Sequence, residues 1–197
     1  MKIEKLTDTG KTGSVAISPD GKMVVHVLAD AGQQSLWVRH IATGSNVQII
    51  PPAEVFYGNL TVTPDGSYIY FTRTGKDEQY SMLYSVPVFG GDPKKIAENV
   101  TGAVAFSPDA RQIAFVRYPW LNNENYLIIA NADGTNERTL ATIKREAGFK
   151  TGPAWSPDGR TGGQRMVSTN GGNQPRWRSD GKESCQADAA GRSSLPD

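Results

Sequence analysis

Two histidines, His26 and His40, are the side chains best suited to proton transfer or metal ligation. Both fall in short apolar segments that read as β-strands, and no third ligand stands at a spacing that would complete a metal site with them. We therefore predict that both histidines are strand residues satisfied by neighbours or solvent. No metal or other cofactor is expected.

Motifs for nucleophilic catalysis and phosphoryl transfer are missing from the sequence. No Gly-x-Ser-x-Gly occurs, and the Gly-rich loop, His-Arg-Asp and Asp-Phe-Gly of protein kinases are likewise absent. Residues 131–137 (NADGTNE) superficially resemble a calcium loop, but they lack its alternating Asp/Asn and distant Glu, which favours a plain turn. The single cysteine, Cys185, excludes an intramolecular disulfide and a multi-Cys zinc site. We expect no enzymatic activity from these residues.

The charge balance excludes one class of partner. Lys and Arg total 21 against 20 Asp and Glu, whereas nucleic-acid and anionic-membrane binders need a basic excess. No apolar run reaches the length of a membrane-spanning helix, and MKIEKLTDTG lacks the apolar core of a signal peptide. We expect no nucleic-acid partner and no membrane insertion, and the residues themselves leave the location open.

An internal sequence repeat determines the scaffold on which any functional side chains must lie. One pattern, a short apolar alternation entering a Pro-Asp turn, occurs in Val15–Val27, Leu60–Thr72, Val104–Val116 and Pro153–Arg160, and more weakly in Pro175–Glu183. Its aspartates, Asp20, Asp65, Asp109 and Asp158, are 45, 44 and 49 residues apart. A period near 45 matches one four-stranded blade of a β-propeller.

The turn residues have a structural interpretation. Pro presets φ, Asp bonds nearby amides and Gly relieves strain at the turn exit. The predicted turn positions are Pro19, Asp20, Gly21, Pro64, Asp65, Gly66, Pro108, Asp109, Pro157, Asp158 and Gly159, with Ala110 replacing Gly in the third copy.

Alternating apolar residues flank each turn, as in Val15 and Ile17 before the first and Ile69 and Phe71 after the second. A period of two predicts strands with one buried face. Two further short strands follow in each unit, so we predict an all-β array of four-stranded antiparallel blades, incomplete in this chain. The array covers 3–182, with blade units at about 13–50, 58–98 and 102–142, a partial blade at 151–182, and an irregular, disordered tail at 183–197.

The pattern breaks at both ends. Ile3–Leu6 read as the last strand of a blade, which indicates either ring closure by this strand or truncation of a longer parent. After Arg160 the second and third strands of a blade are not recognisable, and Gln164–Thr169 read as a fourth. We hypothesise an internal deletion near Arg160 and a lost reading frame or truncation near Glu183. A natural, divergent tail is the alternative.

In its [Ser/Thr]-Pro-Asp-Gly turns and their spacing the chain resembles the TolB-like, PD-type β-propeller family, which is WD-repeat-like. It is most similar to the propeller modules of bacterial receptor serine/threonine kinases. The resemblance implies a non-enzymatic scaffold that binds a protein or small ligand, as the sensor or interaction module of a signalling protein. It also implies an extracytoplasmic location for a full-length parent. A stand-alone TolB-like periplasmic adaptor, the gating propeller of a serine peptidase and a truncated product without its own function are the alternatives.

Loops that connect the second to the third strand, and the fourth strand to the next blade, share one end of a propeller. Exposed aromatic and amide side chains there form contact patches. The candidate binding residues are Phe56, Tyr57, Tyr118, Trp120, Asn122 and Asn123. The competing interpretation is that Phe56 and Trp120 pack between blades as core.

Overall fold

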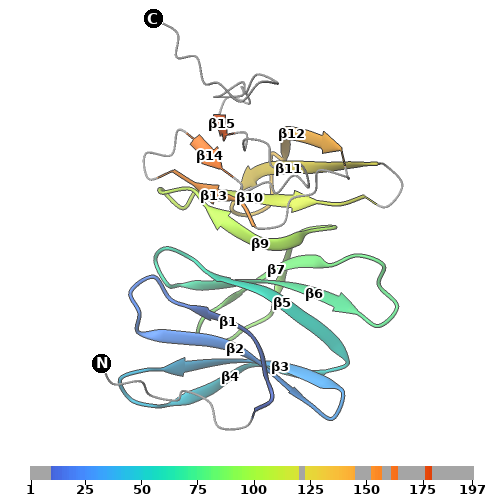
Figure 1. Cartoon of the computed structure of the whole chain (residues 1–197). Coiled ribbons are helices and arrows are strands. Elements are labelled where there is room, and N and C mark those ends of the chain that lie inside the picture. Colours follow the sequence, from blue (N-terminus) through green and yellow to red (C-terminus); the bar gives the residue numbers. More distant parts are fainter. Residues whose placement is uncertain (1–9, 120–122, 145–151, 157–160, 164–175, 179–197) are drawn as a thin grey trace, which may run out of the picture. The chain divides into compact units, whose positions relative to one another are not determined.

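The computed structural model describes residues 10–119, 123–144, 152–156, 161–163 and 176–178 (Figure 1). Every regular element in these ranges is a β-strand, and none of the described residues belongs to a helix that could span a membrane. The chain divides into two compact units, residues 1–98 and 99–197, and each is described by itself.

The first unit contains two four-stranded antiparallel sheets. Blade 1 consists of β1 (Thr12–Ile17), β2 (Met23–Asp30), β3 (Gln33–His40) and β4 (Asn46–Ala53). Blade 2 consists of β5 (Val55–Val62), β6 (Tyr68–Gly75), β7 (Met82–Pro87) and β8 (Lys94–Ala97). In each sheet the spatial order of the strands follows the chain order.

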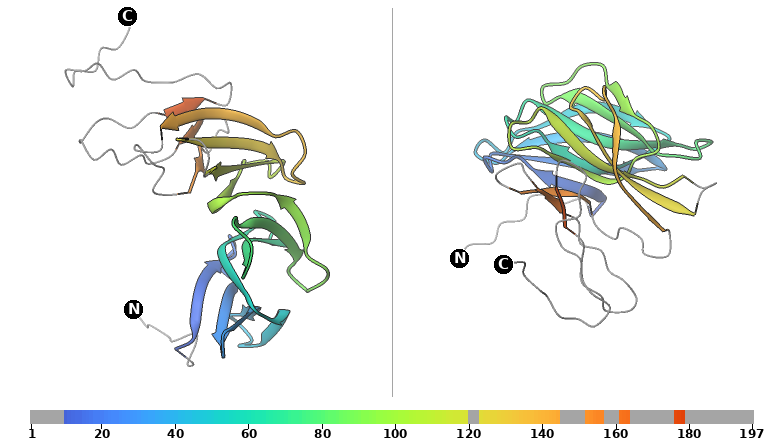
Figure 2. Two further views of the ribbon diagram at one scale, coloured as in Figure 1. Left: turned by 90° about the vertical axis from the view of Figure 1, so that its right-hand side faces the viewer. Right: turned by 90° about the horizontal axis from the view of Figure 1, so that it is seen from above.

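The second unit repeats this arrangement once and then departs from it. Blade 3 consists of β9 (Thr101–Phe106), β10 (Gln112–Arg117), β11 (Glu124–Asn131) and β12 (Arg138–Lys144). A three-stranded sheet follows, with β13 (Ala154–Trp155), β14 (Thr161–Gly163) and β15 (Arg176–Arg178). Figure 2 shows each sheet as a twisted antiparallel ribbon. The prediction of an all-β protein built from four-stranded antiparallel blades is confirmed.

Three of the four predicted Pro-Asp turns lie in the described residues, and all three have the same hydrogen bonds. In the first, Ser18 Oγ donates to Asp20 Oδ1 at 2.6 Å and accepts from the amide of Met23 at 2.9 Å, while Asp20 Oδ1 also accepts from the amide of Lys22. Thr63 with Asp65, and Ser107 with Asp109, repeat this pattern. These bonds keep buried hydroxyls satisfied where the first strand turns into the second. The fourth turn, Pro157, Asp158 and Gly159, lies outside the described residues.

The residue after each turn aspartate has a positive φ: +71° at Gly21, +74° at Gly66 and +58° at Ala110. Glycine adopts this left-handed conformation freely, whereas a Cβ atom makes it costly. The third turn is therefore strained at Ala110.

The core of the first unit lies between its two blades. Blade 1 contributes Val25, Val27, Leu36 and Val38, and blade 2 contributes Val62, Ile69, Phe71 and Val86 to one buried cluster. Each set alternates along its strands, so one side of each sheet faces the other sheet. Full burial of such side chains contributes about 1.5–3 kcal/mol each, which makes this contact the main stabilisation of the unit.

The prediction that Val15 and Ile17 form a buried face is wrong for this blade. Both side chains are exposed, while Ala16 between them packs against the core cluster. The reason is that alternation gives each strand two faces, and only the Ala16 side of β1 is turned towards blade 2.

At the ends of the chain most predictions go untested. Ile3–Leu6, Gln164–Thr169, Cys185 and the tail at 183–197 lie outside the described residues. One detail differs from expectation: after the fourth turn a short strand, β14, pairs with β13, with Ala154 opposite Gly163. A second strand therefore follows that turn, although the sequence there has no alternating apolar residues that would predict a strand.

Candidate functional site

A cleft of about 760 Å³ opens between blade 1 and blade 2 where the β2–β3 and β6–β7 loops and the β4–β5 connection meet. Its volume falls in the range of ligand-binding pockets, roughly 300–1,000 Å³. The lining residues are Lys11, Ala29–Gln34, Glu54–Phe56 and Thr74–Lys76. None of them is buried, so the cleft is an open groove rather than an enclosed cavity.

The blade 1 side of the cleft is a two-residue hairpin turn. Asp30 and Gln33 pair across the turn, and both intervening residues have positive φ, +49° at Ala31 and +80° at Gly32. Such turns match the right-handed twist of paired strands. The left-handed backbone conformation is nevertheless costly at Ala31, as it is at Ala110, because both residues have a Cβ atom. Lys11 Nζ donates to Asp30 Oδ1 at 2.6 Å, and this hydrogen bond, together with the lysine's charge, lowers the pKa of Asp30.

A hydrogen bond beside the cleft connects the two blades. Gln34 Oε1, from β3, accepts a hydrogen bond from the amide of Tyr57 in β5 at 2.6 Å. This bond joins the two sheets beside the groove, which Gln34 lines.

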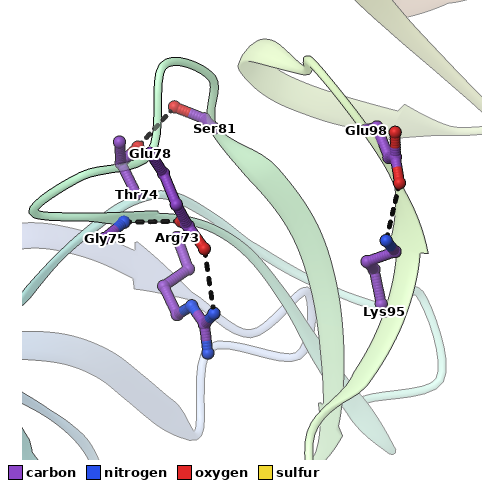
Figure 3. Close-up of polar contacts among 7 residues, drawn as sticks. All are labelled: Arg73, Thr74, Gly75, Glu78, Ser81, Lys95 and Glu98. Atoms are coloured by element: carbon purple, nitrogen blue, oxygen red, sulfur yellow. Dashed lines mark hydrogen bonds and ion pairs between the residues drawn. The ribbon is translucent and has the colours of Figure 1, made fainter.

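Glu78 braces the blade 2 side, the β6–β7 loop (Figure 3). Glu78 Oε2 accepts from the amide of Gly75 at 2.6 Å, and Glu78 Oε1 accepts from Arg73 Nη2 at 3.3 Å. The hydrogen bond from the Gly75 amide lowers the pKa of Glu78 most, and the hydrogen bond and positive charge of Arg73 lower it further. The hydroxyls of Thr74 and Ser81 also lie 2.7 Å apart across the loop. This network pre-organises the rim that Thr74, Gly75 and Lys76 contribute.

Phe56 is the aromatic side chain of the cleft. It is 59% exposed, and its ring extends over Gly58, because a Cβ atom on Gly58 would lie 3.0 Å from Phe56 Cε1. The position of the ring excludes the interpretation of Phe56 as a core residue. An exposed aromatic with a fixed position is typical of the centre of a binding patch.

Tyr57, the next candidate, has a different environment. Its side chain is buried, and its ring meets that of Phe71 edge to face with centroids 5.6 Å apart. Neighbouring residues on a strand point to opposite faces, so Phe56 and Tyr57 cannot both face the cleft. Tyr57 is a core residue and does not line the cleft; its amide binds Gln34, which does.

The other candidates belong to the second unit and are not among the residues that line the cleft. Tyr118 is partly buried and packs against the blade 3 cluster that includes Val116 and Leu127. Asn123 is exposed, immediately before β11. Trp120 and Asn122 lie outside the described residues.

Sequence reasoning placed Glu54 and Lys76 in loops of the predicted binding end but named no charged residue of the cleft as a candidate. Lys11 and Asp30 are 19 residues apart, and Glu54 stands alone between β4 and β5. The hairpin pairing of β1 with β2 would have identified Lys11, since its carbonyl accepts from the amide of Ala29 at the end of that ladder. Glu54 has no comparable pattern.

The groups that line the cleft can contact a ligand through charge, hydrogen bonds and an aromatic surface. Its lining offers ammonium groups (Lys11, Lys76), carboxylates (Asp30, Glu54), amides (Gln33, Gln34) and one aromatic ring. Among the described residues, no histidine, cysteine or serine lines it. In the part of the chain that the structure describes, no three His, Cys, Asp or Glu side chains are grouped to hold a metal ion. The two histidines lie in β2 and β3, and His26 Nε2 is 3.2 Å from Asn46 Oδ1.

Comparison with solved structures identifies the fold. The chain is similar to TolB from Acinetobacter baumannii, with a TM-score of 0.70 and 21% identity over 91% of this chain and 44% of that one. It is also similar to a putative TolB from Agrobacterium tumefaciens (TM-score 0.66, 22% identity, 89% of this chain and 61% of that one). A third similar structure is a prolyl endopeptidase (TM-score 0.62, 12% identity, 86% and 28%).

The fold is thus that of TolB-like β-propellers, and the chain spans about half the length of these two TolB structures. Neither a protein-family model nor a curated protein sequence matches it.

Proposed function

We propose that this chain is a non-enzymatic binding scaffold of the β-propeller type, and that the cleft between blades 1 and 2 is its recognition site. The observation that supports this most directly is Phe56, an exposed aromatic ring between two braced loops. Aromatic anchors surrounded by polar groups supply most of the affinity in protein interfaces.

The shape and charge of the cleft favour an extended polypeptide segment as ligand. No residue that lines the groove is buried, so it suits a strand or loop better than a small molecule that needs enclosure. Lysines and carboxylates both line it, so complementary charges of both signs on the segment would fix its direction. An apolar side chain of the segment would rest on the Phe56 ring.

The biological setting that we propose is the sensor or interaction module of a bacterial signalling protein, such as a receptor serine/threonine kinase. This setting rests on the resemblance of the repeats to the propellers of such kinases. Reading the coding sequence on both sides of this chain tests it. An in-frame kinase domain and membrane span would support the setting, and their absence from both flanks would refute it.

A gating propeller of a serine peptidase is the second candidate, and the likeness to a prolyl endopeptidase favours it. In that case the flanking sequence would encode a hydrolase domain with Gly-x-Ser-x-Gly. A stand-alone adaptor resembling TolB would instead have a signal peptide and no catalytic domain.

Selection of peptides from a displayed random library on the immobilised full chain tests the binding site itself. Affinities of the selected peptides are then compared between the unmodified chain, Phe56→Ser and the control Phe89→Ser. Phe89 is more exposed than Phe56 but lies in the β7–β8 turn, away from the cleft lining. We expect Phe56→Ser to weaken binding about tenfold or more, as loss of an aromatic anchor does, and Phe89→Ser to leave it unchanged. Equal affinities for both variants would refute the assignment of the cleft.

A further inference from the structure

The outer strand of blade 3, β12, ends its sheet. In the described part of the chain the order of this sheet is β12-β11-β10-β9, so β12 pairs with β11 alone (Figure 1). The opposite edge of the sheet is covered, because β9 lies against β13 of the following sheet. An edge strand directs the backbone N–H and C=O groups of every second residue outward, where another strand can pair with them.

Blades 1 and 2 have outer strands that are poorly suited to such pairing. Each of the three outer strands has a bulge, one extra residue against its inner neighbour, which is Ile49 in β4, Ile96 in β8 and Leu140 in β12. The difference lies in the residues after this bulge. In β4 they include Pro51 and Pro52, which have no amide hydrogen to donate, and β8 has a single residue after its bulge.

β12 continues beyond its bulge as a regular ladder. Ala141–Lys144 pair one to one with Glu124–Leu127, and no proline or glycine interrupts the segment. Because the backbone groups alternate in direction along an antiparallel strand, two of the four residues point theirs away from β11. This segment therefore keeps the donors and acceptors that proline and an early end remove from the other two outer strands.

The side chains of this segment differ between the two sides of the sheet. Ala141 is buried and Ile143 is partly buried, and both pack in the blade 3 cluster. Thr142 and Lys144 alternate with them and are exposed on the other side. An incoming strand would place an apolar residue beside Ile143 and a polar or charged one beside Lys144, since neighbouring side chains across strands must match.

Charge distinguishes between the strands that could bind here. β12 contains two cations, Arg138 and Lys144, and no carboxylate. Lys144 pairs with Glu124 of β11, but the carboxylate of Glu124 already accepts a hydrogen bond from the Tyr126 hydroxyl at 2.8 Å. The same strand from a second copy would bring two further cations, and like charges across a sheet are destabilising. The edge therefore favours an acidic strand of another protein over self-pairing.

We propose that Ala141–Lys144 of β12 is a second interaction site, which binds an extended segment of a partner protein by strand addition. The segment has apolar residues on one side and carboxylates on the other. In this mode of recognition main-chain hydrogen bonds supply affinity, and alternate side chains supply specificity. The site is separate from the cleft, whose lining residues all belong to the first unit, so either proposal can fail without the other.

A synthetic strand tests the proposal on the full chain. The probe is the acetylated peptide amide Glu-Val-Thr-Val-Thr-Val-Glu with a fluorescent label, titrated by fluorescence anisotropy. The same peptide N-methylated at its five central residues keeps the side chains and charge but lacks the amide hydrogens that strand pairing needs. We expect N-methylation to weaken binding about tenfold or more, because it removes several hydrogen bonds at once. Equal affinities would refute strand addition, and so would the absence of binding at about 1 mM peptide.

Amide hydrogen exchange locates the bound peptide. Saturation with the unmethylated peptide should slow exchange in Ala141–Lys144 about fivefold or more, because the outward amides become paired. Exchange in β4 and β8 should stay unchanged. Protection confined to other strands would overturn the assignment of the site to β12.

Lys144→Gln tests the charge contact, and Lys94→Gln is the matched control. Lys94 is an exposed lysine of another outer strand, β8. Loss of an exposed ion pair should weaken binding of the peptide about threefold in Lys144→Gln, whereas Lys94→Gln should bind it as the unmodified chain does. The same affinity in both variants would contradict the placement of the acidic strand beside Lys144.

Pairing of β12 with β12 of a second copy is the competing outcome, and sedimentation of the chain without peptide distinguishes it. We expect no dimer that forms through this edge. A concentration-dependent dimer whose formation slows exchange in Ala141–Lys144 would overturn the proposal in favour of self-pairing.

Discussion

Ala110 offers a direct test of how the repeated turns are stabilised. It has a φ of +58° at the position where the other two described turns have glycine, at +71° and +74°. A non-glycine residue pays about 1–2 kcal/mol for the left-handed conformation. Glycine in turn costs about 0.4–1 kcal/mol through the greater freedom of the unfolded chain. The difference predicts that Ala110→Gly stabilises the blade 3 turn by about 0.5–1 kcal/mol.

The assay is amide hydrogen exchange of peptides that cover β9 and β10, because a local measurement separates blade 3 from the first unit. A gain of that size slows exchange through local opening about two- to fivefold. The reverse change, Gly21→Ala, should speed exchange in β1 and β2 by a similar factor. No atom lies within 4 Å of a Cβ added to Gly21, so its cost arises from the backbone alone. If Ala110→Gly speeds exchange, or Gly21→Ala slows it, the argument from φ is refuted.

Two further predictions concern the hydrogen bonds of these turns. Thr63→Val should cost about 1–3 kcal/mol in urea unfolding, since it breaks the part-buried hydrogen bond from the amide of Tyr68 to Thr63 Oγ1 and the bond from that hydroxyl to Asp65. Thr63→Ser keeps the hydroxyl and should stay close to the unmodified chain; a loss in Thr63→Ser as large as that in Thr63→Val would contradict the assignment to the hydroxyl. Acid should weaken all three turns, because hydrogen bonds from Ser or Thr hydroxyls lower the pKa of Asp20 to about 2 and lower those of Asp65 and Asp109. A depressed carboxyl pKa adds stability above its unfolded value near 4, and this stability is lost as the pH falls towards 2. The thermal midpoint should therefore drop over that range, with a smaller drop in Asp20→Asn; an unchanged slope in that variant would contradict the assignment.

The turns were predictable from the sequence because their interactions are local. The hydroxyl, the aspartate and the amides that they bind all lie within six residues, so the Ser-Pro-Asp-Gly pattern specifies the complete geometry. The same pattern, at a period near 45, predicts the four-stranded blades. Even Ala110 was recognisable as a departure, although only the structure shows the positive φ that makes it costly.

The site was less predictable, because it depends on contacts between distant segments. Lys11 meets Asp30 only after β1 and β2 pair, and Gln34 meets Tyr57 only after two sheets pack. Loop position and aromatic content predicted Phe56, which lines the cleft, as a binding residue, but they gave no reason to distinguish it from Tyr57. That separation follows from strand alternation, which sends one ring outward and the other into the core.

Alternation alone also misjudged Val15 and Ile17. It predicts which residues share a side of a sheet, but not whether a second sheet covers that side. Leu60 and Val62, which stand 45 positions later in blade 2, are buried in the cluster shared with blade 1, so the outcome depends on the neighbouring blade rather than on the strand.

The short range of the turn bonds has a consequence for how such chains arise. A single copy of the turn contains every atom that its hydrogen bonds need. A duplicated 45-residue segment can therefore form its hairpin at any new position in the chain. The interface between blades has no such independence, because each side requires a matching neighbour. Gene duplication can therefore lengthen the array in one step, while the apolar residues between blades must be adjusted afterwards. This order accounts for turns that are nearly identical and for flanking positions as different as His26 and Phe71.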